Sequence, residues 1–347
     1  MRLEQISALL QQGISDEVFP GAVAVIAEKG KDIYHEAFGN RMVRPQLEAM
    51  RRDTIFDVAS LTKPIVVATL VTLLAEDGIL DVGDPVKTYL PEFNHEEITL
   101  LHLLTHTSGL PAWRPVYLNV KSRDEVSPYL GRIGLDYPTG QQVVYSCLGY
   151  ILLGELIERA AGQSLDRLAQ DWIFAPAEMW TTRYCPPPDW KDNCAATEDS
   201  NVFEKGMANG ERYDWRNGVL CGEVHDENAH FLGGVAGNSG LFSTARDLAK
   251  FCQILLNRGD SILTPDSIDR LSKSHTAGLN SDRSIGWIIL KDGSLYHSGF
   301  TGTSIRLHLE RRMFAILLTN RVHPDASREG ILGFRDQFHK SVFGTSS

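Results

Sequence analysis

The segment Ser60-Leu61-Thr62-Lys63 carries the residue types that serine catalysis needs. A serine hydroxyl is a poor nucleophile until another group takes its proton. A lysine three residues further along a helix lies on the same face, within contact range. An apolar run at residues 64–76 follows directly, so Ser60 would open a helix and feel the positive end of its dipole. The segment therefore predicts a nucleophilic Ser60 beside Lys63; a capped helix with an exposed lysine is the alternative.

A second candidate is the phenol of Tyr145. A phenol can act as a general base if a neighbouring cation lowers its pKa. Tyr145 stands just before a helix that we predict to begin at Leu148, so it can point into a cleft. Tyr117 and Asn119 form a similar triplet, but they lie in an irregular stretch with no apolar helix after it. We therefore prefer Tyr145, with a tyrosine that only packs on the core as the alternative.

A third candidate is the segment His297-Ser298-Gly299-Phe300, between two predicted strands. Small residues would let a substrate backbone lie along the strand edge, and Ser298 could donate a hydrogen bond to a substrate carbonyl or carboxylate. The backbone N–H of Phe300 could supply half of an oxyanion hole, with the N–H of Ser60 as the other half. Taken alone, the segment could equally be a glycine-rich turn.

Together the three segments resemble the Ser-x-x-Lys, Ser-Asp-Asn and Lys-Thr-Gly motifs of serine β-lactamases and penicillin-binding proteins. The chain is similar to the branch in which a tyrosine replaces the first serine of the second motif. That branch contains class C β-lactamases, D-Ala-D-Ala carboxypeptidases and β-lactamase-like esterases. The resemblance covers roughly residues 18–320 and includes the flanking segments 56–59, 103–110, 148–154 and 234–244.

The resemblance implies the roles of the candidate residues. Ser60 would form an acyl-enzyme, Lys63 would accept or relay its proton, and Tyr145 would share the base and acid duties. Residues 297–300 and Cys147 would bind the substrate. The resemblance also implies that the enzyme uses no metal and no cofactor.

Two positions depart from the family pattern. The second motif often ends in Asn, which helps to hold the substrate amide and the lysine; here Cys147, a poor hydrogen-bonder, takes its place. The third motif often begins with Lys; here it begins with His297, which is mostly neutral at pH 7.5 if unperturbed. Family peptidases also use His there, so we expect catalysis to survive but classical β-lactams to bind weakly, unless Arg283 or Arg306 supplies the missing cation.

The sequence thus predicts a serine hydrolase that cleaves ester or amide bonds, with esters preferred over efficient β-lactam hydrolysis. A D-amino-acid peptidase or carboxypeptidase and a true β-lactamase remain alternatives, because all three activities pass through one acyl-serine. A catalytically inactive scaffold or binding protein of the same fold is a more remote alternative.

The elements around these segments run in the order strands, helices, strands, helix. Predicted strands lie at 21–28, 31–39, 284–290, 293–298, 302–309 and 314–319, and predicted helices at 3–12, 64–76, 99–105, 148–161, 164–173, 244–256 and 334–343. Ser164 and Thr244 are predicted helix caps. The irregular stretch 185–227 is expected to be an ordered excursion on the surface.

This order predicts an α+β, β-lactamase-like fold. Strands from both ends of the chain would share one antiparallel sheet flanked by helices, with a mostly helical lobe beside it and the active site between them. We expect a single catalytic domain over residues 1–347, with an α/β lobe of about 1–59 and 240–347 and a helical lobe of about 60–239.

Composition narrows the partners and the compartment. The net charge of −10 would repel phosphate backbones, so we expect a small-molecule substrate and no nucleic acid. The five cysteines are scattered, and a metal site at 225–230 is less favoured than a polar loop. Met1–Glu17 lacks a signal-peptide pattern and residues 65–75 are too short to span a bilayer. The expected location is cytoplasmic, or periplasmic or secreted if a leader was removed; the oligomeric state stays open.

Overall fold

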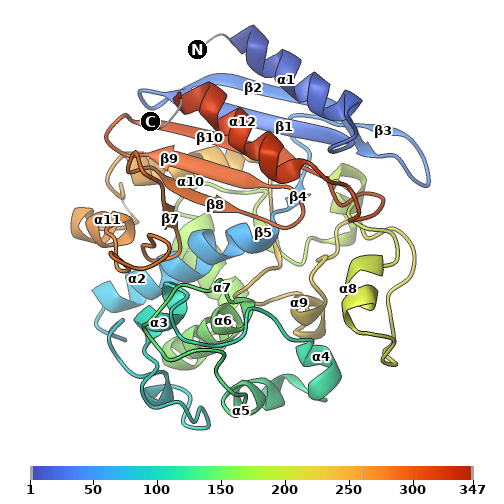
Figure 1. Cartoon of the computed structure of the whole chain (residues 1–347). Helices are drawn as coiled ribbons and strands as arrows, with labels where there is room; N and C mark the ends of the chain where they lie inside the picture. The colour runs from blue at the N-terminus through green and yellow to red at the C-terminus, as the bar shows by residue number, and fades with distance from the viewer. Residues whose placement is uncertain (1–2, 261, 345–347) are drawn as a thin grey trace.

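The computed structural model describes residues 3–260 and 262–344, and it has a sheet at one end and a mostly helical region at the other (Figure 1). The sheet has seven antiparallel strands in the order β3-β2-β1-β10-β9-β8-β7. Its strands are β1 (Gly21–Glu28), β2 (Lys31–Met42), β3 (Glu48–Ala49), β7 (Ile288–Ile289), β8 (Leu295–Ser298), β9 (Ser304–His308) and β10 (Met313–Thr319). Strands from both ends of the chain share this sheet, which confirms the predicted α+β fold.

The residues of strand β1 pack on both faces of the sheet. Successive strand residues face opposite sides of a sheet. Val23 faces the large core shared with the helical region, while Ile26 faces the helices α1 (Leu3–Ser15) and α12 (Ile331–Phe343). In Figure 1 these two helices lie together across the outer face of the sheet. Because both faces of β1 are covered, its residues are apolar almost without interruption.

The helical region lies between the two halves of the sheet in the sequence. Its elements are η3 (Val86–Thr88), α3 (Leu100–Leu104), α4 (Val116–Asn119), η4 (Arg123–Glu125), α5 (Val126–Leu130), α6 (Cys147–Ala161), α7 (Leu165–Ala169), η5 (Gln170–Phe174), η6 (Pro188–Asn193), α8 (Val202–Met207) and α9 (Glu227–Phe231). A small antiparallel sheet follows the order β4-β6-β5, with β4 (Phe56–Asp57), β5 (Arg183–Tyr184) and β6 (Leu241–Ser243). Helices α10 (Ala245–Leu256) and α11 (Pro265–Ser272) lead back to the main sheet.

One continuous helical stretch runs through the core. It begins as a 3-10 turn, η1 (Ala59–Leu61), continues as a π-helix, η2 (Lys63–Ala68), and ends as α2 (Thr69–Glu76). It is longer than the run that we predicted and, by length and composition, could cross a membrane. However, 78% of it is buried inside the molecule, which is typical of a core helix.

The two predicted helix caps differ in the structure. Thr244 accepts a hydrogen bond from the backbone N–H of Asp247 at 3.2 Å, as predicted for the start of α10. Ser164 precedes α7 but its side chain makes no capping hydrogen bond. Instead, the carboxylate of Glu158 accepts from the N–H of Leu165 at 2.9 Å.

Two further predictions were wrong in extent. The strand predicted at 284–290 shrinks to β7, because Gly286 adopts φ +82° and packs so tightly that a Cβ there would lie 2.6 Å from Ala68. The stretch 185–227 is not only a surface excursion: it includes α8, and the buried Glu204 and His225 face the interior. The lobe boundaries stay a prediction, and residues 1–2 and 345–347 of the predicted domain lie outside the described residues.

Candidate active site

Ser60 lies in the tight 3-10 turn that opens the core helix. The residue before it, Ala59, has φ +49°, a left-handed conformation that is uncommon for a residue with a Cβ. Hydrogen bonds hold this conformation: the N–H of Ala59 donates to Asp57 Oδ1 at 2.9 Å, and Thr62 Oγ1 donates to the carbonyl of Ala59 at 2.7 Å. Strained backbone of this kind is common at functional sites because the surroundings hold it in place.

The turn after β8 is fastened to the backbone just before Ser60. Thr301 Oγ1 donates to the carbonyl of Asp57 at 2.7 Å, and Thr303 Oγ1 donates to the carbonyl of Val58 at 3.0 Å. Gly299 approaches so closely that a Cβ there would lie 2.4 Å from the carbonyl oxygen of Val58. Only glycine fits, and this contact places the backbone of Phe300 beside the turn that holds Ser60.

Lys63 is fully buried directly behind the nucleophile. Its Nζ donates to Ser60 Oγ at 3.0 Å and to the carbonyl of Asn238 at 2.7 Å, and lies 3.7 Å from Cys147 Sγ. Burial alone would lower the pKa of Lys63, but the thiol of Cys147 and the phenol of Tyr145, when ionised, outweigh burial and raise it. Burial in turn raises the pKa of the Cys147 thiol, and the charge of Lys63 opposes this rise.

Tyr145 stands just before α6, where the predicted catalytic phenol belongs. Its ring packs on His106 with centroids 4.5 Å apart, and Lys63 Nζ lies 5.1 Å from its centroid. Burial raises the pKa of Tyr145, while the charge of Lys63 opposes this rise. Tyr117, the alternative phenol, packs instead on Tyr213 and does not line the cavity that contains Ser60.

His297 lies at the end of β8, and its ring centroid is 6.1 Å from that of Tyr145. Only 2% of it is exposed, and its Nδ1 lies 3.1 Å from the carbonyl oxygen of Ser298. Burial, together with the charges of Lys63 and Arg283, lowers the pKa of His297 well below its usual value. The ring is therefore neutral near pH 7, and it supplies no charge to hold an anion.

Arg283 supplies the cation that His297 does not. It is 8% exposed, lines the same cavity, and lies 6.0 Å from the ring centroid of Tyr145. Within residues 3–260 and 262–344, its Nε has no hydrogen-bond partner. The other candidate, Arg306, pairs with Asp292 at 2.6 Å and does not line the cavity.

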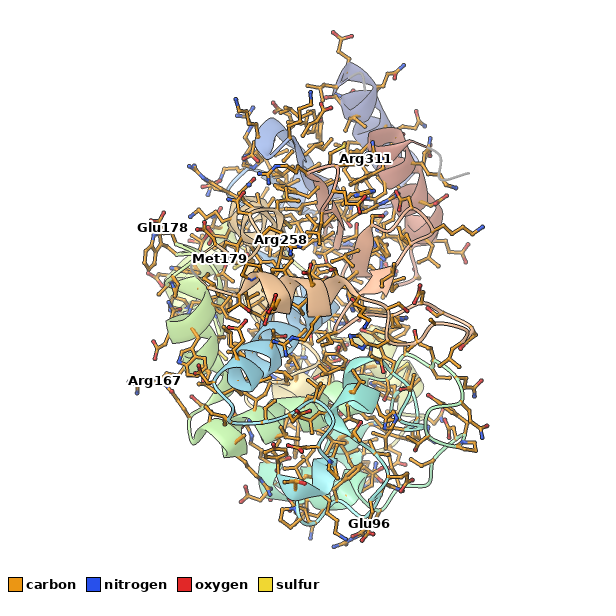
Figure 2. The ribbon with its side chains drawn as sticks, turned by 90° about the vertical axis from the view of Figure 1, so that its left-hand side faces the viewer. Glu96, Arg167, Glu178, Met179, Arg258 and Arg311 are labelled. Carbon is orange, nitrogen blue, oxygen red and sulfur yellow. The ribbon has the colours of Figure 1, made fainter. Side chains whose placement is uncertain are left out.

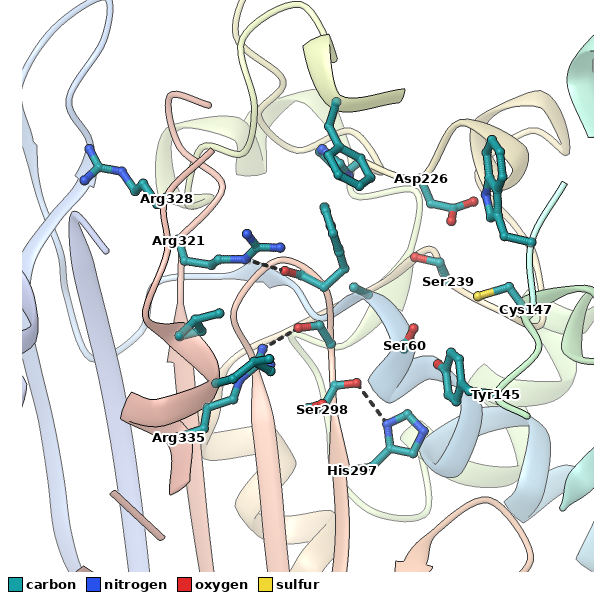
Figure 3. Close-up of a pocket in the computed structure, with 18 of the residues that line it drawn as sticks. Ser60, Tyr145, Cys147, Asp226, Ser239, His297, Ser298, Arg321, Arg328 and Arg335 are labelled. Atoms are coloured by element: carbon teal, nitrogen blue, oxygen red, sulfur yellow. Dashed lines mark hydrogen bonds between the residues drawn. The ribbon is translucent and has the colours of Figure 1, made fainter. Parts of the chain in front are cut away.

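A cavity of about 730 Å³ joins these groups (Figure 3). It is lined by the predicted site residues Ser60, Tyr145, Cys147, His297, Ser298, Gly299 and Phe300, with Lys63 behind Ser60. Two facing groups of polar side chains also line it. We call Glu204, Asp226 and Ser239 the acceptor wall, and Arg321, Arg328 and Arg335 the arginine wall. In Figure 3 the labelled members of the two walls lie on opposite sides of Ser60.

The sequence motifs did not reveal either wall. Among three aromatic residues of the helical region, Trp113 lines the cavity, whereas Tyr117 and Tyr137 do not. Asp226 lies in the loop 225–230, which carries possible metal ligands, but no group of three or more such ligands occurs in the described part of the chain. His225 of this loop is used otherwise, because its Nε2 lies 2.9 Å from Glu198 Oε2. The sequence signal that could have revealed the acceptor wall was a cluster of acidic residues in an irregular stretch.

The molecular surface contains other charged groups that take no part in this cavity. Figure 2 labels several of them, including Glu96, Arg167 and Arg258, none of which lines the cavity. Arg258 forms an exposed ion pair with Asp269 at 2.6 Å. Exposed pairs of this kind contribute little to stability.

Comparisons with known proteins identify the family. A family model described as Beta-lactamase matches residues 6–338. An N-acetylmuramyl-L-alanine amidase from Bacillus subtilis (strain 168) is 31% identical, and the match covers 99% of this chain and 87% of that protein.

Solved structures show the same fold at lower identity. EstCE1, a hydrolase with promiscuous acyltransferase activity, has a TM-score of 0.77 at 21% identity, covering 99% of this chain and 98% of that one. A beta-lactamase/D-alanine carboxypeptidase from Yersinia pestis, complexed with citrate, has a TM-score of 0.73 at 19% identity and covers 99% of each chain.

Proposed function

The chain belongs to the β-lactamase family and is a hydrolase of that superfamily, and from this premise we propose that it cleaves ester and amide bonds through an acyl-enzyme on Ser60. One observation carries the proposal: a fully buried lysine amine, Lys63 Nζ, lies 3.0 Å from the hydroxyl of Ser60 at the bottom of a large cavity. A nucleophile within hydrogen-bond reach of a possible base is the arrangement that covalent catalysis requires.

The proposed steps use only side chains that are in contact. Ser60 Oγ attacks the substrate carbonyl, and its proton passes to the pair formed by Lys63 and Tyr145. The N–H groups of Ser60 and Phe300 stabilise the negative oxygen of the tetrahedral intermediate. As the intermediate collapses, the leaving amine or alcohol takes the proton from the pair. Water then attacks the acyl-enzyme, releases the acid and restores Ser60.

Arg283 narrows the substrate class. A buried guanidinium without a carboxylate partner favours a substrate that brings its own anion. We therefore propose substrates whose leaving group carries a carboxylate, as the alanine in the name of the Bacillus subtilis relative does. A peptidase or carboxypeptidase activity would satisfy the same requirement, so both belong in the substrate panel.

Small activated esters should still be cleaved faster than cephalosporins. The neutral His297 is not the reason, because Arg283 provides a cation in the same cavity. The reason is Cys147, whose Sγ is a weaker hydrogen-bond partner than the amide that often stands there. Activated esters need no such clamp because their leaving group departs without help.

The test is labelling followed by a substrate panel. Wild type and Ser60→Ala are treated with a fluorophosphonate, and intact mass is measured. We expect one adduct on wild type and none on Ser60→Ala; equal labelling of both proteins would refute the assignment. The panel then compares a p-nitrophenyl ester, N-acyl amino acids, D-peptides and nitrocefin.

The proposed partner is accordingly a small molecule. The amidase and carboxypeptidase names of the relatives fit cell-wall chemistry, so we keep a periplasmic or secreted location beside the cytoplasmic location predicted from the sequence.

A further inference from the structure

The acceptor wall has polar atoms that are buried but unused. Ser239 is 3% exposed and Glu204 is 4% exposed. Both line the cavity, yet Ser239 Oγ has no hydrogen-bond partner among the residues that the structure describes, and the carboxyl of Glu204 has the phenol of Tyr117 as its side-chain partner. Leaving a buried polar atom without a partner is costly, so such atoms at a cavity point to a ligand that pairs with them.

Asp226 adds a charge to this wall. Its Oδ1 accepts from the N–H of Ala229 at 2.7 Å and caps α9, which leaves Oδ2 for another partner. Figure 3 shows Asp226 and Ser239 on the same side of Ser60, close to Cys147. Burial first, and the charge of Asp226 after it, raise the pKa of Glu204 well above its usual value. No lysine or arginine forms an ion pair with Asp226 or Glu204 in the described residues, although the charge of Asp226 acts on Lys63.

The side of the cavity opposite the acceptor wall carries positive charge. Arg321, Arg328 and Arg335 gather there, and Arg283 lies near Tyr145. The three wall arginines donate to backbone carbonyls, whereas Arg283 Nε has no partner among the described residues. A ligand in this cavity can therefore meet carboxyl and hydroxyl oxygens at the acceptor wall and a guanidinium at Arg283. A zwitterionic molecule matches this distribution of charge better than a neutral or a purely anionic one.

We propose that the acceptor wall binds a protonated amine on the acyl part of the substrate, so that the enzyme hydrolyses aminoacyl amides or esters with a free amino group. This proposal rests on the proposed acyl-enzyme function. An ammonium group has three N–H donors and no acceptor, which suits a wall of oxygen acceptors. An α-amino group is also adjacent to the reacting carbonyl, and Asp226 and Ser239 line the same cavity as Ser60.

Two nearly isosteric substrates test the proposal. Alanyl-p-nitroanilide and isobutyryl-p-nitroanilide differ in having an ammonium or a methyl group at the same position. The ratio of their kcat/KM values is measured for each protein, because a ratio within one protein is independent of its active fraction. Both enantiomers of the alanyl substrate are included.

The expected result is a fall in this ratio when the wall is altered. Asp226→Asn removes the charge but keeps a residue that can cap α9, and it should lower the alanyl-to-isobutyryl ratio roughly tenfold to a hundredfold. Ser239→Ala should lower the ratio by a smaller factor and serves as a second variant if Asp226→Asn fails to fold. Glu223→Gln, an exposed site outside the cavity, should leave it unchanged.

The outcomes separate this proposal from the proposed function. If wild type hydrolyses p-nitrophenyl acetate and Ser60→Ala does not, the acyl-enzyme function holds. If, under those conditions, the ratio is the same in wild type, Asp226→Asn and Ser239→Ala, the amine proposal is wrong. If neither ester nor anilide is hydrolysed and Ser60 takes no label, the proposed function itself fails.

Discussion

The acceptor wall and the arginine wall carry opposite charges, but the larger difference between them is how their polar atoms are used. Arg321 Nε donates to the carbonyl of Phe300 at 2.9 Å, and Arg335 Nη2 donates to the carbonyl of Gly299 at 2.5 Å. Arg328 donates to the carbonyl of His323 at 3.1 Å. The arginines thus already bind the protein's own backbone, with Arg335 Nε left without a partner in the described residues.

The comparison shows that charge alone does not identify a binding surface. A guanidinium that donates to backbone carbonyls holds a turn, whereas a carboxyl or hydroxyl oxygen with no partner can take a ligand. Arg321 and Arg335 therefore hold the β8–β9 turn and Arg328 holds the backbone at His323, whereas the acceptor wall acts on the substrate. Arg335 is the clearest case, because the carbonyl of Gly299 and the N–H of Phe300 belong to one peptide group. A hydrogen bond to that carbonyl orients and polarises the proposed oxyanion donor.

The largest expected effect on activity comes from substituting Tyr145. Tyr145→Phe should lower kcat/KM for a p-nitrophenyl ester ~10²- to 10⁴-fold, the usual loss when a general acid or base is removed. Tyr117→Phe is the matched control, since Tyr117 lies outside the cavity and its pKa is raised by burial and then by the charges of Glu204 and Glu227. A larger loss for Tyr117→Phe than for Tyr145→Phe would reverse the assignment.

A substitution of Arg283 tests whether its guanidinium, whose Nε has no partner in the described residues, binds a substrate carboxylate. Arg283→Gln should reduce kcat/KM roughly ten- to a hundredfold for substrates with a carboxylate on the leaving group, because a charged hydrogen bond contributes ~1.5–3 kcal/mol. An ester with a neutral leaving group should lose much less. Arg306→Gln is the control, since Arg306 pairs with Asp292 outside the cavity. Equal losses for both substrate types would show that Arg283 does not hold the carboxylate.

A substitution of Arg335 tests whether this arginine positions the N–H of Phe300, the proposed oxyanion donor. Loss of one oxyanion donor typically costs 10²–10³-fold in kcat, and Arg335 acts on that donor only through its peptide group. Arg335→Met should therefore lower kcat about tenfold with little change in KM, and Arg335→Lys should restore part of it. A boronic acid that mimics the tetrahedral intermediate should lose affinity by a similar factor. If KM rises while kcat and boronate affinity are unchanged, the arginine binds substrate directly.

The sequence was informative where the chemistry is local. Ser60 and Lys63 are three residues apart on one helical stretch, so spacing alone placed them together, and the structure has their side chains 3.0 Å apart. Likewise, apolar runs at both ends of the chain predicted the shared sheet. These features depend on neighbours in the sequence.

The rest of the site depends on tertiary packing, for which a single sequence carries little signal. Arg283 and Arg306 looked equivalent as candidate cations, and the ion pair of Arg306 with Asp292 decided between them. Asp226 and Ser239 come from irregular segments with no periodicity to mark which way they face. The strand predicted at 284–290 failed for the same reason, since Gly286 bends the chain onto the core helix.

The smallest expected effect concerns His297, on the arginine side of Ser60. The family pattern suggests that His297→Lys would supply a cation and narrow the gap between esters and nitrocefin. The structure predicts otherwise, because a lysine there would be buried beside Lys63 and Arg283, whose charges and whose surroundings already keep His297 neutral. Such a lysine would lose its proton or destabilise the fold, since an unpaired buried charge is costly.

We therefore expect nitrocefin hydrolysis by His297→Lys to change no more than a fewfold, with a Tm lower than that of wild type. His230→Lys, an exposed site outside the cavity, controls for the added charge. The pKa of His297 lies well below 6.5, so wild-type kcat/KM for a neutral ester should also show no inflection from this ring between pH 6 and 8. A tenfold gain on nitrocefin at unchanged Tm would mean that the cavity can hold a charged lysine at position 297 after all.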